Sequence, residues 1–142
     1  GMKKCAHCKK QFEQKSSLQK YCSYECAKAE TKKKSRKLTR EVNKVKNNLM
    51  KEWALKVKER AGFKCEYCGK TEYLNSHHIF SRSNRTTRYD LDNGMCLCTG
   101  CHTFSSKFSA HKTPAEFIEW IKVYRGLEWY EELRRKAKCC LV

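Results

Sequence analysis

Residues 65–102 contain groups of cysteines and histidines at spacings that are typical of metal binding. Two CxxC pairs, Cys65/Cys68 and Cys98/Cys101, together offer the four thiolates of a tetrahedral zinc site. Four thiolates saturate such an ion, so the histidines of the same segment are available for a different role.

Three histidines and an asparagine accompany these cysteines. His77 and His78 are neighbours, Asn93 lies in Leu-Asp-Asn-Gly, and His102 directly follows the second cysteine pair. Neighbouring residues of a strand point to opposite sides, so His77 and His78 would flank a substrate from two directions instead of sharing one ion. Imidazole serves as a metal ligand and, near pH 7, as a general base. The segment therefore predicts an enzyme with a structural zinc and a second, open metal site.

In type and order, these residues resemble the HNH nucleases, which have the ββα-metal fold, over about residues 62–112. The resemblance implies that His77 and His102 bind the catalytic metal and that His78 is the general base that deprotonates water. It assigns Asn93 a supporting role, in which hydrogen bonds within the loop brace the histidine strand. Phosphodiester hydrolysis needs such an activated water, and a cation that stabilises the departing 3′ oxygen.

The catalytic metal has few predicted ligands. Some members of the family supply another ligand one helical turn after the His102 position, where this sequence has Ser106. With two protein ligands, water and phosphate complete the shell, so we expect Mg²⁺ or Mn²⁺, with Zn²⁺ or Ni²⁺ as alternatives. His111 is an alternative third ligand, although it is expected beyond the end of the helix.

A second pair of cysteine knuckles lies in residues 1–27: Cys5, Cys8, Cys22 and Cys26. So short a segment has almost no core, and we expect a small zinc ribbon whose fold depends on the ion. His7, inside the first knuckle, is an alternative ligand. The sequence thus predicts two structural Zn²⁺ sites.

Eleven cysteines also suit a secreted disulfide framework. The CxxC spacings, the lysine-rich composition and the absence of a visible signal segment favour reduced thiolates instead. We therefore expect a cytoplasmic protein, in a bacterium or in a phage-infected host cell. Gly1, before Met2, is interpreted as a cloning remnant.

The net charge of +17 favours a polyanionic partner. Residues 28–64 hold fourteen Lys or Arg against four Glu, which gives +10. No apolar stretch approaches the ~18 residues that span a bilayer, so we expect DNA and not a membrane. A solvated face is the alternative for the densest cluster, which we expect to contact phosphates: Lys32, Lys33, Lys34, Arg36 and Lys37.

Apolar residues within residues 28–64 recur at spacings of three and four: Leu38, Val42, Val45, Leu49, Trp53 and Val57. They predict an amphipathic helix from about Thr39 to Arg60, with Gly62 as its stop. The apolar stripe must pack on the nuclease domain or on the same helix of a second subunit. The second alternative implies a homodimer through residues 38–60.

Residues 65–112 should form the ββα-metal unit, with its elements in this order: a strand at Leu74 to Phe80, a loop at 81–92, a return strand at Gly94 to Leu97 and a helix at about Thr99 to Phe108. Arg82, Arg85 and Arg88 recur in the loop, where we expect them to place the scissile phosphate.

Residues 113–142 should form helices that pack on the nuclease unit. Thr113-Pro114 resembles a helix start, with Thr113 as the cap and Glu116 at the third position, and Gly126 separates two helices. Cys96, Cys139 and Cys140 are expected to be ordinary thiols.

The expected fold is therefore small α+β: a zinc-stapled ββα-metal HNH unit (65–112) with flanking helices (28–64, 113–142) and an N-terminal zinc ribbon (1–27). The expected function is a metal-dependent DNA endonuclease that nicks DNA or cuts both strands. The alternative is a non-catalytic, zinc-dependent nucleic-acid-binding protein with a degenerate HNH fold. The arrangement of knuckles, basic helix and HNH-like unit also resembles the NinG (Rap) recombination proteins of lambdoid phages.

Overall fold

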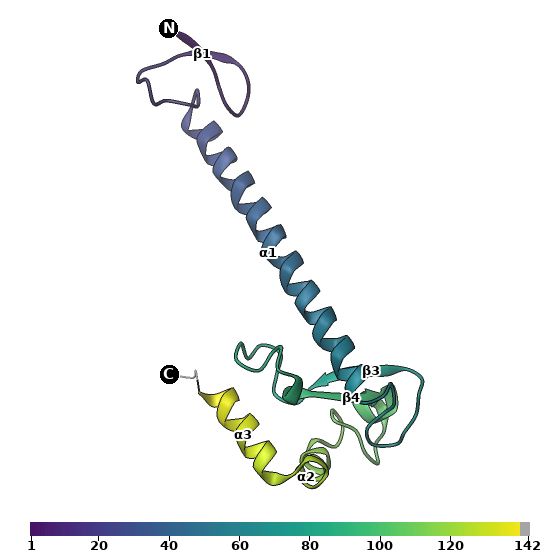
Figure 1. Cartoon of the computed structure of the whole chain (residues 1–142). Helices are drawn as coiled ribbons and strands as arrows, with labels where there is room; N and C mark the ends of the chain where they lie inside the picture. Colours follow the sequence, from purple (N-terminus) through teal and green to yellow (C-terminus); the bar gives the residue numbers. More distant parts are fainter. Residues whose placement is uncertain (140–142) are drawn as a thin grey trace. The chain divides into compact units, whose positions relative to one another are not determined.

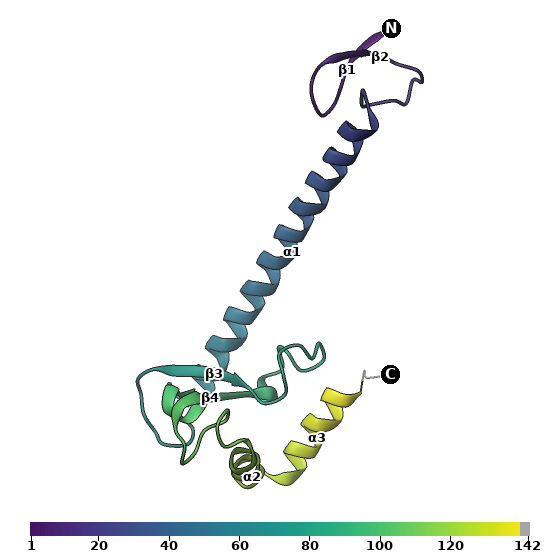
Figure 2. The ribbon, with the colours of Figure 1, turned by 180° about the vertical axis from the view of Figure 1, so that it is seen from behind.

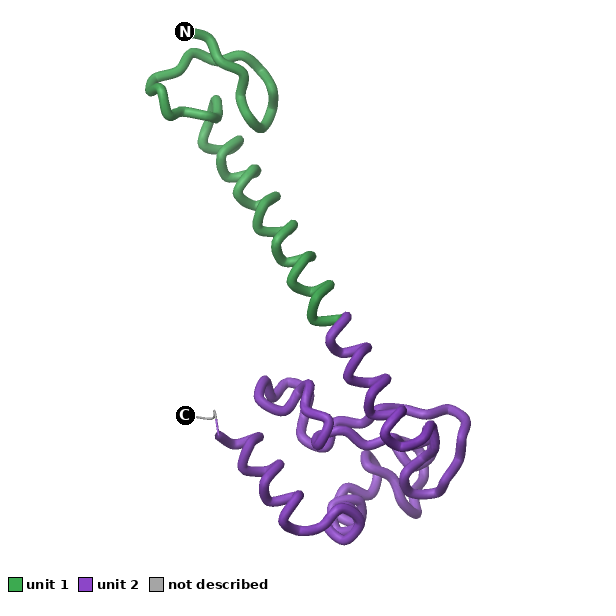
Figure 3. Tube along the Cα trace, viewed as in Figure 1, with its two compact units in different colours: residues 1–47 green, residues 48–142 purple. Residues whose placement is uncertain are grey.

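The computed structural model describes residues 1–139, so the expectation for Cys140 lies outside the described residues. The chain divides into two compact units, Gly1–Asn47 and Asn48–Val142 (Figure 3). The small α+β fold predicted from the sequence is confirmed, with one pair of short strands in each unit.

The N-terminal unit begins with a short antiparallel hairpin. Strand β1 (Met2–Lys4) pairs with β2 (Gln11–Glu13), and Lys3 lies opposite Phe12. The first knuckle forms the turn of this hairpin, closed by a hydrogen bond of 2.8 Å from Cys5 N to Lys10 O. A further bond of 2.9 Å from Ala6 N to Lys20 O joins the second knuckle to the first.

Helix α1 (Tyr24–Arg60) is longer than predicted, because it begins at Tyr24 and not near Thr39. Its start is inside the second knuckle, where Ser23 Oγ accepts a hydrogen bond of 3.2 Å from Cys26 N. The Lys-, Arg-, Glu- and Ala-rich sequence that follows contains no helix breaker, so helix propensity suffices without an apolar pattern. The helix ends as predicted before Gly62, which has a φ of 66°. No helix in the described part of the chain has the length and apolar character that a bilayer span requires.

Only the last part of the apolar stripe on α1 is covered. Trp53 and Val57 are buried and pack with Cys96 in a small core cluster. A Cβ added at Gly94 would overlap Val57, so a glycine is required where the helix meets the strand. Leu38 and Val45, by contrast, are about three-fifths exposed. The prediction that the stripe packs on the nuclease domain thus holds for residues 53–57.

The second unit contains the two central strands. Strand β3 (Leu74–His78) pairs antiparallel with β4 (Gly94–Cys98), as Figure 1 shows and Figure 2 confirms from behind. Both predicted strands are confirmed, although β3 ends at His78 and not at Phe80. All of β4 is buried, and a single 3₁₀ turn (Leu91–Asn93) precedes it.

The predicted helix from Thr99 to Phe108 is wrong. In its place a single π-helical turn forms, η2 (Gly100–Phe104), and extended backbone follows at Ser105. The chain then runs back beside the turn, with a hydrogen bond of 2.9 Å from Ala110 N to Cys101 O and one of 3.1 Å from His111 N to His102 O. The backbone groups that a helix would have paired are therefore bonded to this returning segment.

Two helices complete the unit, α2 (Pro114–Arg125) and α3 (Leu127–Lys138). Their break at Gly126, with a φ of 101°, was predicted. Thr113 precedes α2 as predicted, but its hydroxyl exchanges hydrogen bonds with the backbone of Ser109 and does not cap the helix. Phe117 and other apolar residues of α2 and α3 pack on β4 and the second cysteine cluster, so the predicted packing of these helices is observed.

Candidate catalytic metal centre

The cysteine cluster of the second unit is able to hold zinc. The Sγ atoms of Cys65, Cys68, Cys98 and Cys101 all lie within 4.8 Å of one another. Cys68 Sγ and Cys98 Sγ are 3.6 Å apart, close to the roughly 3.8 Å between thiolates on a tetrahedral zinc with bonds of about 2.3 Å. That distance is far too long for a disulfide bond.

The N-terminal cluster has the same character. The Sγ atoms of Cys5, Cys8, Cys22 and Cys26 lie within 4.8 Å of one another, and Cys22 Sγ is 3.6 Å from both Cys8 Sγ and Cys26 Sγ. His7 is paired with Glu30 at 3.0 Å, so the ring of the alternative ligand points to a carboxylate of α1.

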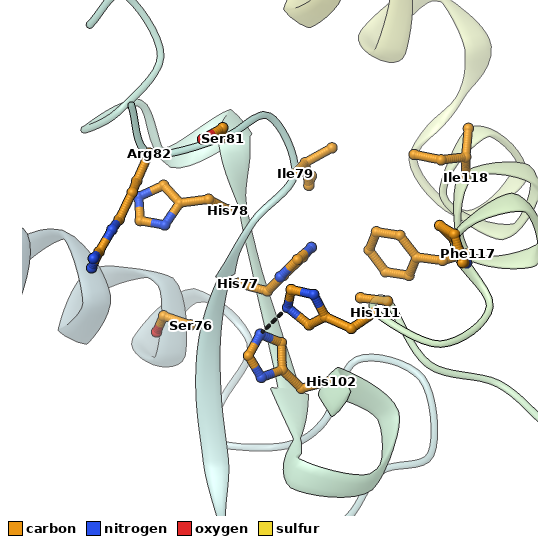
Figure 4. A pocket seen from close by; sticks show the side chains of 12 residues that line it. Ser76, His77, His78, Ile79, Ser81, Arg82, His102, His111, Phe117 and Ile118 are labelled. Atoms are coloured by element: carbon orange, nitrogen blue, oxygen red, sulfur yellow. Dashed lines mark hydrogen bonds between the residues drawn. The ribbon is translucent and has the colours of Figure 1, made fainter. Parts of the chain in front are cut away.

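Three histidines converge on one point of the second unit. Figure 4 shows His77 from β3, His102 from η2 and His111 from the returning segment pointing toward one another. One ring nitrogen from each lies within 4.8 Å of the others, and the Nε2 atoms of His102 and His111 are 3.2 Å apart. The rings are steeply inclined to each other, at 66°, 84° and 79°. This arrangement suits three nitrogen ligands around one cation.

His111 is the ligand candidate that the sequence treated only as an alternative. The predicted helix would have carried His111 away from His102, whereas the early end of the helical turn at Phe104 allows the two rings to meet. The serines at 105 and 106 favour turns over helix interiors, and they were the available signal that the helix stops early. Ser106, which occupies the position of a family ligand, is exposed and lies outside the histidine cluster.

The environment favours the neutral form of two of these imidazoles, His77 and His102. Burial, together with the neighbouring His102, His111 and His78, lowers the pKa of His77 to about 3. Burial and His111 also lower the pKa of His102. Neutral rings have the free lone pairs that a metal requires. The Nδ1 atom of His102 lies 3.1 Å from Thr103 Oγ1, a partner that orients the ring and leaves Nε2 toward the centre.

His78 lies on the opposite side of β3 from His77, as the alternation of a strand requires (Figure 4). Its Nε2 is 3.0 Å from the carbonyl oxygen of Arg88. A carbonyl only accepts, so Nε2 carries the proton and Nδ1 keeps a lone pair. Burial lowers the pKa of His78, which keeps that lone pair free at neutral pH.

Asn93 connects the histidine strand to the loop. It is fully buried, and its Oδ1 accepts a hydrogen bond of 2.7 Å from Phe80 N. Its Nδ2 donates to Phe80 O at 3.0 Å and to Thr87 O at 3.1 Å. The side chain therefore fixes the backbone just after His78, and it does not reach the histidine cluster.

The histidines line a pocket of about 600 Å³. Of the three loop arginines, Arg82 lines this pocket and is exposed. Arg88 turns back to the loop instead, where its Nε donates to Arg82 O at 2.7 Å. Arg85 is exposed and is not part of the pocket wall. Phe117 and Ile118 of α2 form the opposite, apolar wall (Figure 4).

The predicted phosphate-binding cluster lies in the first unit, on the N-terminal part of α1. All of its members are exposed: Lys32, Lys33, Lys34, Arg36 and Lys37. Arg40, one turn further, adjoins the same surface. This part of the helix therefore presents a dense cluster of cations to solvent.

One comparison with known proteins finds a domain match in the second unit. Residues 65–107 match the family model described as HNH endonuclease, a segment that includes both cysteine pairs, the histidine pair and His102. Neither the curated proteins nor the solved structures include a match to the chain. Since the matched segment has the two strands, the cysteine cluster and the histidine pair in the expected places, the chain carries an HNH domain over these residues.

Proposed function

We propose that the protein is a metal-dependent DNA endonuclease that hydrolyses phosphodiester bonds in the pocket between β3 and α2. The observation that carries this proposal is the convergence of His77, His102 and His111 on one side of β3, with His78 oriented on the other. The alternative, a non-catalytic binding protein, is less favoured because a degenerate member would be expected to lack the base or a ligand.

The ligand set favours a transition metal. A bound divalent cation would supply a Lewis acid that polarises the scissile phosphate and stabilises the departing oxygen. Imidazole suits Zn²⁺ and Ni²⁺, whereas Mg²⁺ and Mn²⁺ prefer carboxylate and water oxygens. The cluster offers three imidazoles and no carboxylate. We therefore propose Zn²⁺ or Ni²⁺ as the catalytic metal in preference to Mg²⁺ or Mn²⁺. This reverses the preference drawn from the sequence, which predicted only two protein ligands.

His78 is proposed as the general base. Its Nδ1 takes the proton of the attacking water, while the carbonyl of Arg88 stabilises the imidazolium that results through Nε2–H. Arg82 is the loop arginine best placed to contact the phosphate, because it lines the pocket. Asn93 keeps the end of β3 in place.

The other expected properties are parts of the same proposal. The two cysteine clusters hold structural Zn²⁺, which fits a reducing, cytoplasmic compartment. The basic surface of α1 supplies general affinity for DNA. A homodimer would have to use the exposed stripe Leu38 to Leu49, since Trp53 and Val57 are covered by the domain itself. The role in phage recombination or DNA processing that the NinG resemblance suggests stays a prediction.

Cleavage of supercoiled plasmid by the purified protein, with a panel of divalent metals, tests the proposal. We expect nicked or linear product with wild type and a loss of about 10²–10⁴ in rate for His78→Ala, because a general base acts in the transition state. Zinc content and DNA affinity should be unchanged in this variant. Binding without cleavage by wild type in every metal would favour the non-catalytic alternative. Wild-type turnover by His78→Ala would remove His78 from the mechanism.

A further inference from the structure

An aromatic side chain from outside the matched HNH segment stacks on the proposed general base. The indole of Trp53, on α1, lies parallel to the imidazole of His78, with ring centroids 3.9 Å apart and planes inclined by 13°. Trp53 is only 3% exposed. One face of the imidazole is thus covered by a large, fixed ring.

The two rings are also tied to the same short stretch of loop. Trp53 Nε1 donates to Asp90 O at 2.8 Å, and His78 Nε2 lies 3.0 Å from Arg88 O. The imidazole is therefore held at one edge by the loop backbone and on one face by a ring that the same loop fixes. Within the described residues Nδ1 makes no hydrogen bond, so its lone pair stays free in the plane of the ring.

The end of α1 is anchored firmly enough to make Trp53 a rigid support. Within the second unit, Ser76 Oγ donates to Ala54 O at 2.7 Å, which ties the helix to β3. Two nitrogens of Arg60 donate to Leu91 O and Gly94 O, both at 2.6 Å. Two residues that follow Trp53 along the helix are therefore bonded to the elements that carry and follow His78.

We infer that Trp53 is a positioning residue of the hydrolysis reaction, which holds the His78 imidazole in the orientation where Nδ1 reaches the attacking water. This inference rests on the proposed function, because a base has a role only in a nuclease. Without the indole, the His78 ring keeps its hydrogen bond to the Arg88 carbonyl but loses the flat surface that fixes its plane. Misplacement of a catalytic group by about 1 Å costs on the order of a hundredfold in rate. The HNH segment therefore depends on α1 for an oriented base.

The test compares Trp53→Phe with Trp53→Leu in the full-length, zinc-loaded protein. Both variants lose the indole N–H and some volume, but only phenylalanine keeps a flat face for His78. Val57→Ala is the matched control, since Val57 is fully buried in the same core cluster and has no part in the site. Plasmid nicking is measured over a range of DNA concentrations, with the metal that supports wild-type cleavage best, and melting temperature and zinc content are measured alongside.

We expect Trp53→Leu to lower kcat by about tenfold to a hundredfold with little change in KM, and Trp53→Phe to recover most of the loss. Val57→Ala should lower the melting temperature and leave kcat unchanged. Equal kcat for the Phe and Leu variants, or a kcat that follows the melting temperature across all three, would overturn the inference and make Trp53 a core residue only. Absence of cleavage by wild type would overturn the proposed function itself.

Discussion

At the scale of single residues, the adjacency of His77 and His78 places the two imidazoles on opposite faces of one strand. His77 is partly buried among other histidines, where its lowered pKa keeps it neutral for a cation. His78 faces Trp53 and the loop, where a carbonyl selects its tautomer. The sequence was sufficient to predict this placement of the two rings, because alternation along a strand follows from backbone geometry.

His111 gives the sharpest prediction at this scale. His111→Ala should weaken binding of Zn²⁺ and Ni²⁺ at the histidine centre by about tenfold or more and lower cleavage, because the cation loses one of three nitrogen ligands. Ser106→Ala is the matched control, since Ser106 occupies the position of a family ligand but is exposed and outside the cluster. Titration calorimetry on protein that keeps its cysteine-bound zinc measures both affinities. Equal affinities in the two variants would show that two histidines suffice.

At the scale of elements, the sequence predicted those that have a local signature and missed those that depend on the cysteine clusters. Strands β3 and β4 and the break at Gly126 follow from pattern and turn chemistry, and they are confirmed. The prediction of a helix after Thr99 was wrong because the cysteine knuckle has its own turn, and Ala110 pairs with Cys101 across it. The sequence did not predict that α1 begins at Tyr24, because Cys26 belongs both to the second knuckle and to the first turn of the helix.

The cysteine clusters should bind metal far more tightly than the histidine centre. We expect two zinc ions per chain that survive mild EDTA, because structural sites bind with an apparent 10–16 kcal/mol, on the order seen for zinc fingers. The same treatment should remove the ion at His77, His102 and His111 and abolish cleavage. Added metal should then restore it without a change in the circular dichroism spectrum.

Elemental analysis and thiol titration measure these ions and the state of the cysteines. Cys96→Ala is the control, because Cys96 is a buried thiol outside both clusters, and burial, with Glu66 nearby, raises its pKa to about 11. Its zinc content should equal that of wild type. Protein without zinc, or with disulfides among the eight clustered cysteines, would contradict the proposed architecture.

At the scale of the whole molecule, charge and chemistry are carried by different parts of the chain. The net charge of +17 is concentrated in residues 28–64, most of which form α1, while the histidine centre is in the second unit. Long-range attraction depends on the summed charge, whereas hydrolysis depends on a few fixed side chains. The two properties should therefore respond separately to substitution.

Neutralisation of the basic cluster tests this separation. The first variant replaces five exposed cations of α1 with glutamine, which keeps helix propensity: Lys32, Lys33, Lys34, Arg36 and Lys37. The control variant removes the same number of charges from exposed lysines of the N-terminal segment: Lys3, Lys4, Lys10, Lys15 and Lys20. The two variants have the same net charge, so a difference between them reports the position of the charges and not their number.

If all five α1 cations contact phosphates, the slope of log affinity against log salt on duplex DNA should flatten by about 4.5, since each contact contributes about 0.9. The control variant should change the slope much less. Cleavage at saturating DNA should stay near the wild-type rate in both, because neither set lines the histidine pocket. Fluorescence anisotropy at several salt concentrations gives the slopes. An unchanged slope in the α1 variant would mean that these cations form a solvated face and that the HNH domain holds DNA by itself.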